Sequence, residues 1–218
     1  MLANAWDAGS AKMLKSLGAK AIATSSAAYA FTLGRPDGGN VTRDEVLRHA
    51  QDLVAATGLP VQGDFENGFG DDPDTCAETI RLAIEAGLAG VCVEDINPLD
   101  GEPYALELSV ERIGAASAAA RAADTDFVLT ARADGIMTGS YDIEEALRRL
   151  HAFESAGADC LFAPLPRSMD DLKRICQELT APVNVLAAGH YTRIRLQEFA
   201  NAGVARVSLG SSLARVTH

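Results

Sequence analysis

The chain has 218 residues, 48% of them hydrophobic, which is enough apolar material for one large domain with a substantial core. Its 19 basic and 30 acidic residues give a net charge of −11, and without any basic run we expect no nucleic-acid partner. The absence of a stretch of about 18 uncharged apolar residues predicts no membrane span, and four scattered cysteines without metal-type spacing indicate a reduced, cytoplasmic protein.

Short apolar runs alternate with amphipathic stretches along the whole chain. In chain order, the tail of a first strand at 4–9 is followed by seven more strands, at 21–26, 60–65, 90–95, 127–132, 160–164, 182–188 and 206–210. Helices are predicted over 9–18, 42–57, 73–87, 109–123, 142–156, 169–179 and 191–202, and Thr42 with Glu45 has the spacing of a capping box. The strands are continuous apolar runs, which is typical of strands that are covered on both faces.

One junction recurs four times, as "SLGAKAI", "EAGLAGV", "SAGADCL" and "NAGVARV". Each reads as a helix end, a glycine and then a strand, and glycine suits the left-handed residue that closes a helix. Repeated βα units predict an α/β fold. We therefore expect one domain over 1–218, a (β/α)8 barrel, with a doubly wound open sheet as the alternative.

In such a barrel the chemistry lies where strands end and βα loops begin. Carboxylates crowd the ends of the second to fourth strands, and like charges in one place raise each other's pKa values. A divalent cation would relieve this repulsion, and Mg²⁺ prefers carboxylate and water oxygens. Arg132, at the end of the fifth strand, offers a fork for an anionic group. Taken singly, each of these residues could equally be a helix cap, a turn residue or part of a structural ion pair.

Several motifs, in order over nearly the whole chain, resemble the isocitrate lyase/phosphoenolpyruvate mutase superfamily, and within it the phosphoenolpyruvate mutase-like, carboxyphosphonoenolpyruvate phosphonomutase-like branch. They are "NAWDAGSAKML", "TSSAAYAFTLGRPDGG", "GDFENGFG", "GVCVEDI", "TARADG", "ESAGADCLFAP" and "GVARVSLGSSLAR". The resemblance implies a Mg²⁺-dependent barrel that acts on small 2-oxo acids through the enolate of pyruvate. It also implies a homotetramer or homodimer. Family members have a short segment before the first strand and a further helix after the last, and we expect the domain over 1–218 to lack both.

The resemblance assigns roles to particular positions. Asp64 would touch the metal, Mg²⁺ or possibly Mn²⁺, while Asp37, Glu66 and Glu94 would hold its waters. The substrate would be bound by residues from the first, second and fifth strand ends: Trp6, Ser25, Ser26, Ala27 and Arg132. In this reading Arg132 meets the leaving carboxylate or phosphonate.

The departures from the family pattern bear on the reaction. Isocitrate and methylisocitrate lyases carry a Lys-Lys-Cys-Gly-His loop after the fourth strand, where this chain reads "EDINPLDGEPY" over 94–104. Without that cysteine as an acid, we expect C–C cleavage or decarboxylation of the oxaloacetate type, with Arg132 orienting the leaving group and Tyr104 or His190 as proton donor. The alternatives are a P–C bond mutase or hydrolase, a methylisocitrate lyase-like enzyme, and a non-catalytic barrel that binds a dicarboxylate.

Overall fold

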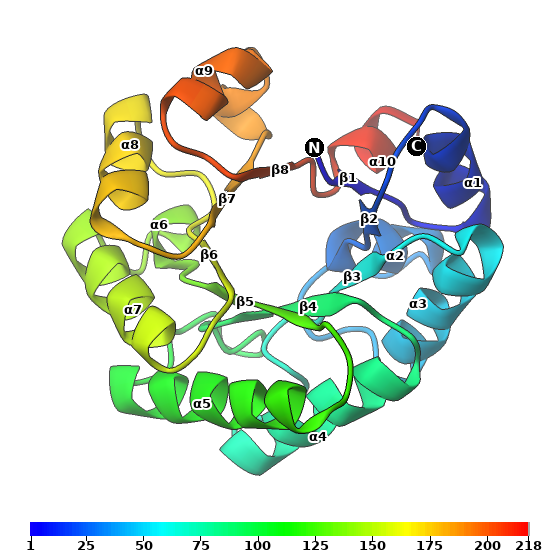
Figure 1. The fold of residues 1–218 in the computed structure, drawn as a ribbon, viewed down its shortest axis with the longest axis horizontal. Helices are drawn as coiled ribbons and strands as arrows, with labels where there is room; N and C mark the ends of the chain where they lie inside the picture. The colour runs from blue at the N-terminus through cyan, green and yellow to red at the C-terminus, as the bar shows by residue number, and fades with distance from the viewer. Residues whose placement is uncertain (218) are drawn as a thin grey trace.

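The computed structural model describes residues 1–217 and shows eight parallel strands there, arranged in chain order with helices around them (Figure 1). The strands are β1 (Ala3–Asn4), β2 (Ile22–Ala23), β3 (Val61–Asp64), β4 (Gly90–Glu94), β5 (Val128–Arg132), β6 (Cys160–Phe162), β7 (Val183–Leu186) and β8 (Arg206–Ser208). The predicted (β/α)8 barrel is therefore confirmed, and the open sheet is excluded by the contact between the first and last strands.

That contact joins residues that are about as far apart in the chain as two residues can be. Leu2 forms a parallel bridge with Ser208, and the Leu2 N–H donates to the Val207 carbonyl at 2.8 Å. The Asn4 side chain reinforces the joint, because its Oδ1 accepts the N–H groups of Leu209 and Gly210, each at 2.9 Å. Asn4 is thus a structural brace between β1 and the loop after β8.

The helices are α1 (Ala8–Ser16), α2 (Ser26–Thr32), α3 (Arg43–Thr57), α4 (Pro73–Glu85), α5 (Leu106–Ala122), α6 (Gly135–Thr138), α7 (Ile143–Ser155), α8 (Met169–Glu178), the 3-10 turn η1 (Gly189–Tyr191), α9 (Leu196–Asn201) and α10 (Ser212–Thr217). The capping box at Thr42 is present at the start of α3. The glycines of the four repeated junctions, Gly18, Gly87, Gly157 and Gly203, all have positive φ, as the pattern predicts.

Three short helices were not predicted, and one predicted helix is shorter. α2, α6 and α10 begin within four residues of a strand end, in segments that read as strand or loop. The second strand stops at Ala23 because Ser25 already caps α2, its hydroxyl accepting the Ala28 N–H. The predicted helix over 191–202 begins only at Leu196, after the 3-10 turn that ends at Tyr191. None of the helices within residues 1–217 has the length and apolar character to cross a membrane.

Alternation along the strands separates the core from the barrel interior. Ile22, Val61, Val91, Leu129 and Leu161 are fully buried in the core. Burying a side chain of this size contributes about 1.5–3 kcal/mol. Their neighbours one position along point to the opposite face of the sheet, which is the inside of the barrel. Polar residues occupy that face, so the fold directs them into a common cavity.

Candidate active site

Asp64 is the last residue of β3, and its carboxylate accepts three hydrogen bonds. Oδ1 accepts from Arg132 Nη1 at 2.9 Å and from the Cys92 thiol at 3.3 Å, and Oδ2 accepts from the Ser26 N–H at 2.9 Å. The N–H of Asp64 itself donates to Thr24 Oγ1 at 2.7 Å. Residues from three other strands or their ends, β2, β4 and β5, therefore hold Asp64, which identifies it as a point where the barrel interior converges.

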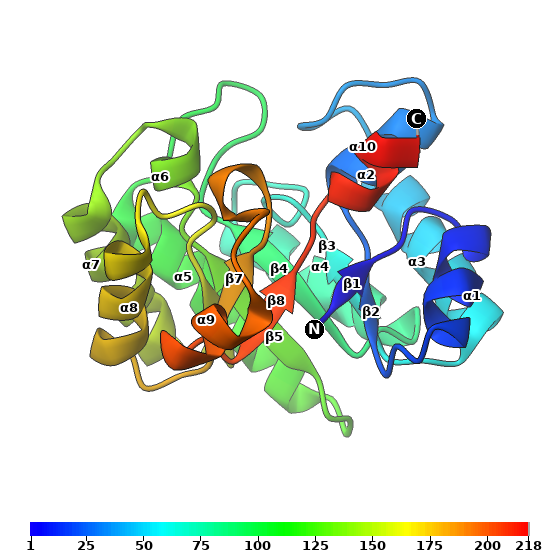
Figure 2. The same cartoon turned by 90° about the horizontal axis from the view of Figure 1, so that it is seen from above.

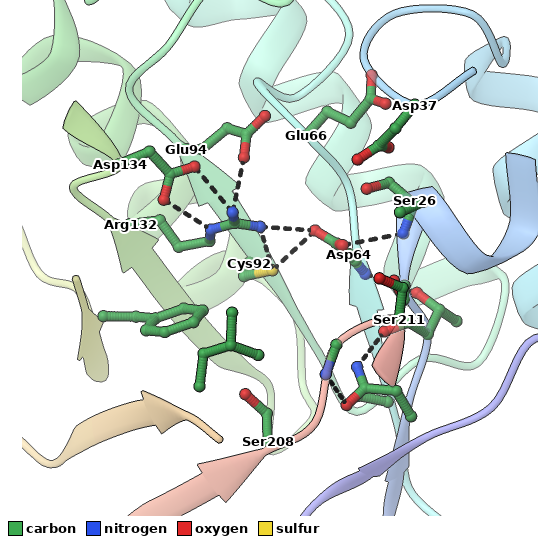
Figure 3. A pocket seen from close by; sticks show the side chains of 18 of the residues that line it. Ser26, Asp37, Asp64, Glu66, Cys92, Glu94, Arg132, Asp134, Ser208 and Ser211 are labelled. Carbon is green, nitrogen blue, oxygen red and sulfur yellow. Dashed lines mark hydrogen bonds and ion pairs between the residues drawn. The ribbon is translucent and has the colours of Figure 1, made fainter. Parts of the chain in front are cut away.

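Arg132 stands at the centre of three carboxylates (Figure 3). Its Nη1 lies 2.9 Å from Asp64, and its Nη2 lies 3.0 Å from Glu94 Oε2 and 2.8 Å from Asp134 Oδ2. Burial acts to lower the pKa of Arg132, but the charges of Asp134, Glu94 and Asp64 outweigh it and raise the pKa well above its usual value. The guanidinium therefore remains a cation in a pocket of acids.

Glu66 lies two residues beyond Asp64 in a strained backbone conformation, with φ of 45°, which residues other than glycine rarely adopt. Its two carboxylate oxygens accept the Gly39 N–H at 3.2 and 3.1 Å, so it holds the loop after α2. Burial raises the pKa of Glu66 to about 7. Asp37 reaches from the same exposed loop into the pocket, where desolvation, and then the charge of Asp64, raise its pKa.

These side chains line one cavity of about 510 Å³ inside the barrel mouth. Of the residues expected at the site, the cavity is lined by Ser25, Ser26, Ala27, Asp37, Asp64, Glu66, Glu94 and Arg132. The opposite wall, from β6, the loop after it and β7, includes the apolar side chains of Phe162, Leu165 and Leu186 beside the polar Asn184. In Figure 3 Asp37 and Glu66 lie together on the side of the cavity away from Ser208. The cavity thus has a charged half and an apolar half.

Three expected site residues lie elsewhere. Trp6 lines a separate hollow beside Tyr29 and His49. The Tyr104 hydroxyl donates to Asp71 at 2.6 Å, and the Arg112 guanidinium covers its ring at 4.2 Å.

His190 lies in η1 with its Nε2 2.9 Å from the Pro166 carbonyl. None of Trp6, Tyr104 and His190 lines the cavity, so we leave them out of the proposed site. They were expected there because they follow strand ends, but their side chains contact other parts of the fold instead.

Sequence reasoning assigned no role to several residues that do line the cavity. Asp134 holds Arg132, Cys92 donates to Asp64, and Arg206 forms part of the floor. The Arg206 guanidinium donates to Gln62, Thr130 and Asn184, at 2.6, 2.9 and 2.8 Å. The available signal was the alternation within the strands, because polar residues at every second position of β3, β5, β7 and β8 share the inner face.

The acids fit a magnesium ion that is held partly through water. Asp37, Asp64, Glu66 and Glu94 all line the cavity, and burial raises the pKa of Glu94 well above its usual value, as it does for Glu66. Their negative charge exceeds what Arg132 alone balances. Residues 1–217 contain no group of three ligand side chains close enough for direct coordination. Mg²⁺ usually keeps several waters and binds through one or two carboxylates, so this donor set suits it.

The chain belongs to the family described as phosphoenolpyruvate phosphomutase, whose model matches residues 1–218. It is 35% identical over 177 residues to 2,3-dimethylmalate lyase of Eubacterium barkeri, covering 78% of this chain and 60% of that protein. It is 33% identical to "Probable 2-methylisocitrate lyase 2" of Corynebacterium glutamicum, covering 79% of this chain and 57% of that protein. It is 35% identical to "Probable 2-methylisocitrate lyase 1" of the same organism, covering 75% of this chain and 54% of that protein. The chain thus spans little more than half the length of these two relatives.

Solved structures show the same relationship. The fold matches a protein of Burkholderia cenocepacia J2315, provisionally described as a lyase/mutase, with a TM-score of 0.95 and 48% identity, covering 99% of this chain and 77% of the other. It matches oxaloacetate acetylhydrolase in complex with the product oxalate with a TM-score of 0.90 and 27% identity, at the same coverage of both chains. The relatives include lyases and a mutase, so they leave the substrate of this chain open.

Proposed function

We propose that this chain is a Mg²⁺-dependent carbon–carbon lyase that acts on a small 2-oxo dicarboxylic acid of the oxaloacetate type, through the enolate of pyruvate or by a related C–C cleavage. The observation that carries the proposal is Arg132, whose side chain is 12% exposed and has partners in three carboxylates, and which lines the cavity together with Ser26 and Asp37. Arginine at such a position suits a planar carboxylate that enters the pocket.

The residues of the chain divide the work of the reaction between them. Arg132 would orient the carboxylate that leaves, and the electron pair of the breaking C–C bond would move toward the 2-oxo group. Phe162, Leu165 and Leu186 would exclude water from the other side, which strengthens the electrostatic interactions inside. The carbon that loses CO₂ then takes a proton from water, giving pyruvate.

A divalent ion would complete the charged half of the site. Asp64 would touch it, and Asp37, Glu66 and Glu94 would hold its waters. When bound, Mg²⁺ supplies positive charge that stabilises negative charge developing on the 2-oxo oxygen. Mn²⁺ would serve the same role, since it accepts the same oxygen donors.

P–C bond chemistry is the second candidate, because the family model is that of a phosphoenolpyruvate phosphomutase. The charged half of the cavity suits a phosphonate as well as a carboxylate. The loop that follows β4, over 95–104, contains no lysine, cysteine or histidine that could act on either substrate. We favour decarboxylation or C–C cleavage because it requires fewer protein groups at this position than isocitrate-type cleavage or P–C transfer.

The proposal is tested with the purified chain and oxaloacetate, phosphonopyruvate, isocitrate and 2-methylisocitrate, with Mg²⁺ or EDTA. Pyruvate, oxalate, glyoxylate and phosphate are all measured, against protein-free controls because dissolved metal ions also activate oxaloacetate. We expect Mg²⁺-dependent pyruvate or oxalate from oxaloacetate. Arg132→Lys should lower this rate by about 10²-fold or more, whereas Asp72→Asn, at the start of α4 and outside the cavity, should not.

Two results would redirect the assignment. Glyoxylate released rapidly from isocitrate would overturn the preference for oxaloacetate, and faster turnover of phosphonopyruvate would transfer the assignment to P–C chemistry. If none of the four substrates is turned over, the proposed function is refuted.

The assembly and the location of the protein belong to the same proposal. We propose a homotetramer or homodimer in the cytoplasm. The four cysteines, Cys76, Cys92, Cys160 and Cys176, are all free, which suits a reducing compartment. Light scattering that shows only a monomer of about the 22.9 kDa chain mass would refute the assembly.

A further inference from the structure

A buried ion pair lies next to the active site but outside its cavity. Asp95, directly after β4, is 2% exposed, and Arg149 of α7 is 5% exposed. Arg149 Nη1 lies 3.0 Å from Asp95 Oδ2. Removing two charges from water is costly, and apolar replacements of such pairs are often equally stable. Stability alone therefore does not explain the pair of Asp95 and Arg149, and the other contacts of Asp95 indicate a further role.

Those contacts reach the turn that follows β5. Asp95 Oδ1 accepts the N–H of Asp134 at 2.9 Å, and the Tyr141 hydroxyl donates to Asp95 Oδ2 at 2.7 Å. The Tyr141 ring also covers Gly135 so closely that a Cβ there would lie 2.2 Å from it. The turn is thus held at two neighbouring residues by one cluster, Asp95, Tyr141 and Arg149.

The turn after β5 also fixes the direction of the Arg132 side chain in the cavity. The Asp134 carboxylate accepts two hydrogen bonds from Arg132: Oδ1 accepts from Nε at 3.2 Å, and Oδ2 accepts from Nη2 at 2.8 Å. Two parallel bonds to a planar guanidinium fix its orientation as well as its position. Asp134 is itself 2% exposed, so solvent does not compete for these bonds.

We propose that Asp95, supported by Tyr141 and Arg149, is a positioning residue that fixes the orientation of Arg132 through the backbone and carboxylate of Asp134. The kinetic consequences of this inference rest on the proposed function, because they assume that Arg132 orients the leaving carboxylate. A misplacement of about 1 Å in a reacting group can cost about 10²-fold in rate. Loss of the cluster should therefore lower turnover without removing any group that touches the substrate.

The kinetic test uses Tyr141→Phe, which removes one hydroxyl and keeps the ring, and Asp95→Asn. Each should lower kcat/KM for oxaloacetate by about 10- to 100-fold. In an Arg132→Lys background the same changes should cost almost nothing, because interacting residues are not additive. A merely structural role would give the same loss in both backgrounds, and that result would overturn the proposal.

Tyr191→Phe is the matched control. It also removes the hydroxyl of a buried tyrosine, here one that donates to the Ser168 carbonyl at 2.8 Å, and Tyr191 does not line the cavity. It should leave kcat/KM unchanged. A loss equal to that of Tyr141→Phe would show that any lost phenol bond lowers activity and would count against the proposal.

A second measurement does not depend on turnover. The Arg132 Nε–H resonance, identified by its loss in Arg132→Lys, reports the bond to Asp134 directly by NMR. It should exchange slowly with water in the unmodified chain and in Tyr191→Phe, and faster in Tyr141→Phe and Asp95→Asn. If no substrate is turned over, the proposed function fails, and this signal alone decides the role of Asp95. An unchanged signal in both cluster variants overturns it.

Discussion

Replacing Arg132 by methionine would test how far the active site depends on a single cation. The change keeps a long apolar side chain and removes the partner of Asp64, Glu94 and Asp134, whose side chains are 16%, 15% and 2% exposed. Breaking a buried pair by removing one member typically costs about 3–5 kcal/mol, because the remaining charge is left uncompensated. For a chain of this size that corresponds to a fall in Tm of roughly 6–20 °C.

The assay is urea and thermal unfolding followed by circular dichroism, in EDTA so that no metal ion replaces the lost charge. Arg174→Met is the matched control, because Arg174 pairs with Glu144 and Glu178 on the surface and is 41% exposed. An exposed pair of this kind contributes about 0–1 kcal/mol.

The pH dependence of Arg132→Met adds a second readout. Burial raises the pKa of Glu94 well above its usual value even though the charge of Arg132 acts to lower it, so removal of the guanidinium should raise the folded-state pKa of Glu94 further above that of the unfolded chain. The folded variant then binds more protons, so its deficit should shrink as the pH falls from about 8 toward about 5. Equal stability of Arg132→Met and Arg174→Met, or a deficit that does not change with pH, would refute the electrostatic account of the site.

Three further changes test other parts of the fold. Burial lowers the pKa of His49, so the unfolded chain binds more protons below about pH 6.5 and stability is lost as the pH falls through that range; His49→Gln should flatten this slope in urea titrations. Thr42→Ala should destabilise the protein by about 1 kcal/mol in thermal unfolding while Thr42→Ser does not, and equal effects would exclude the cap as the cause. Gly63→Ala should cost about 1–3 kcal/mol, because its Cβ would lie 2.4 Å from the Phe65 ring, and Phe65→Leu in the same chain should recover part of the loss.

The fold could be predicted because its signals repeat. Each glycine junction, such as the one at Gly157, marks where a helix ends and a strand begins, and four such junctions among alternating strands and helices favour a barrel of βα units. The short helices α2, α6 and α10 have four to seven residues, which is too few for a period of 3.6 to stand out. α2 begins at the Ser25 cap, whereas α6 has no capping side chain that the sequence could have shown.

The site could be predicted where a residue ends a strand, as with Asp64 and Arg132, because parallel strands bring such residues to one edge. The same reasoning does not hold for Tyr104, which was expected at the site but lies ten residues beyond β4 and does not line the cavity. The loop between them folds back on itself through a bridge between Ile96 and Pro103, and this turns Tyr104 toward Asp71. Distance along the chain does not determine the direction of a side chain in such a loop.

The joint between β1 and β8 has a consequence for how the chain folds. All other neighbouring strands are consecutive in the sequence, so their pairing closes short loops, whereas this joint closes a loop of nearly the whole chain (Figure 2). Long loops cost more entropy to close, and non-local contacts form slowly. We expect a late intermediate with seven strand pairs formed and the edges of β1 and β8 unpaired. Unpaired edges recruit strands from other chains. We therefore expect the Asn4 amide, which ties β1 to Leu209 and Gly210, to limit aggregation of the folding chain.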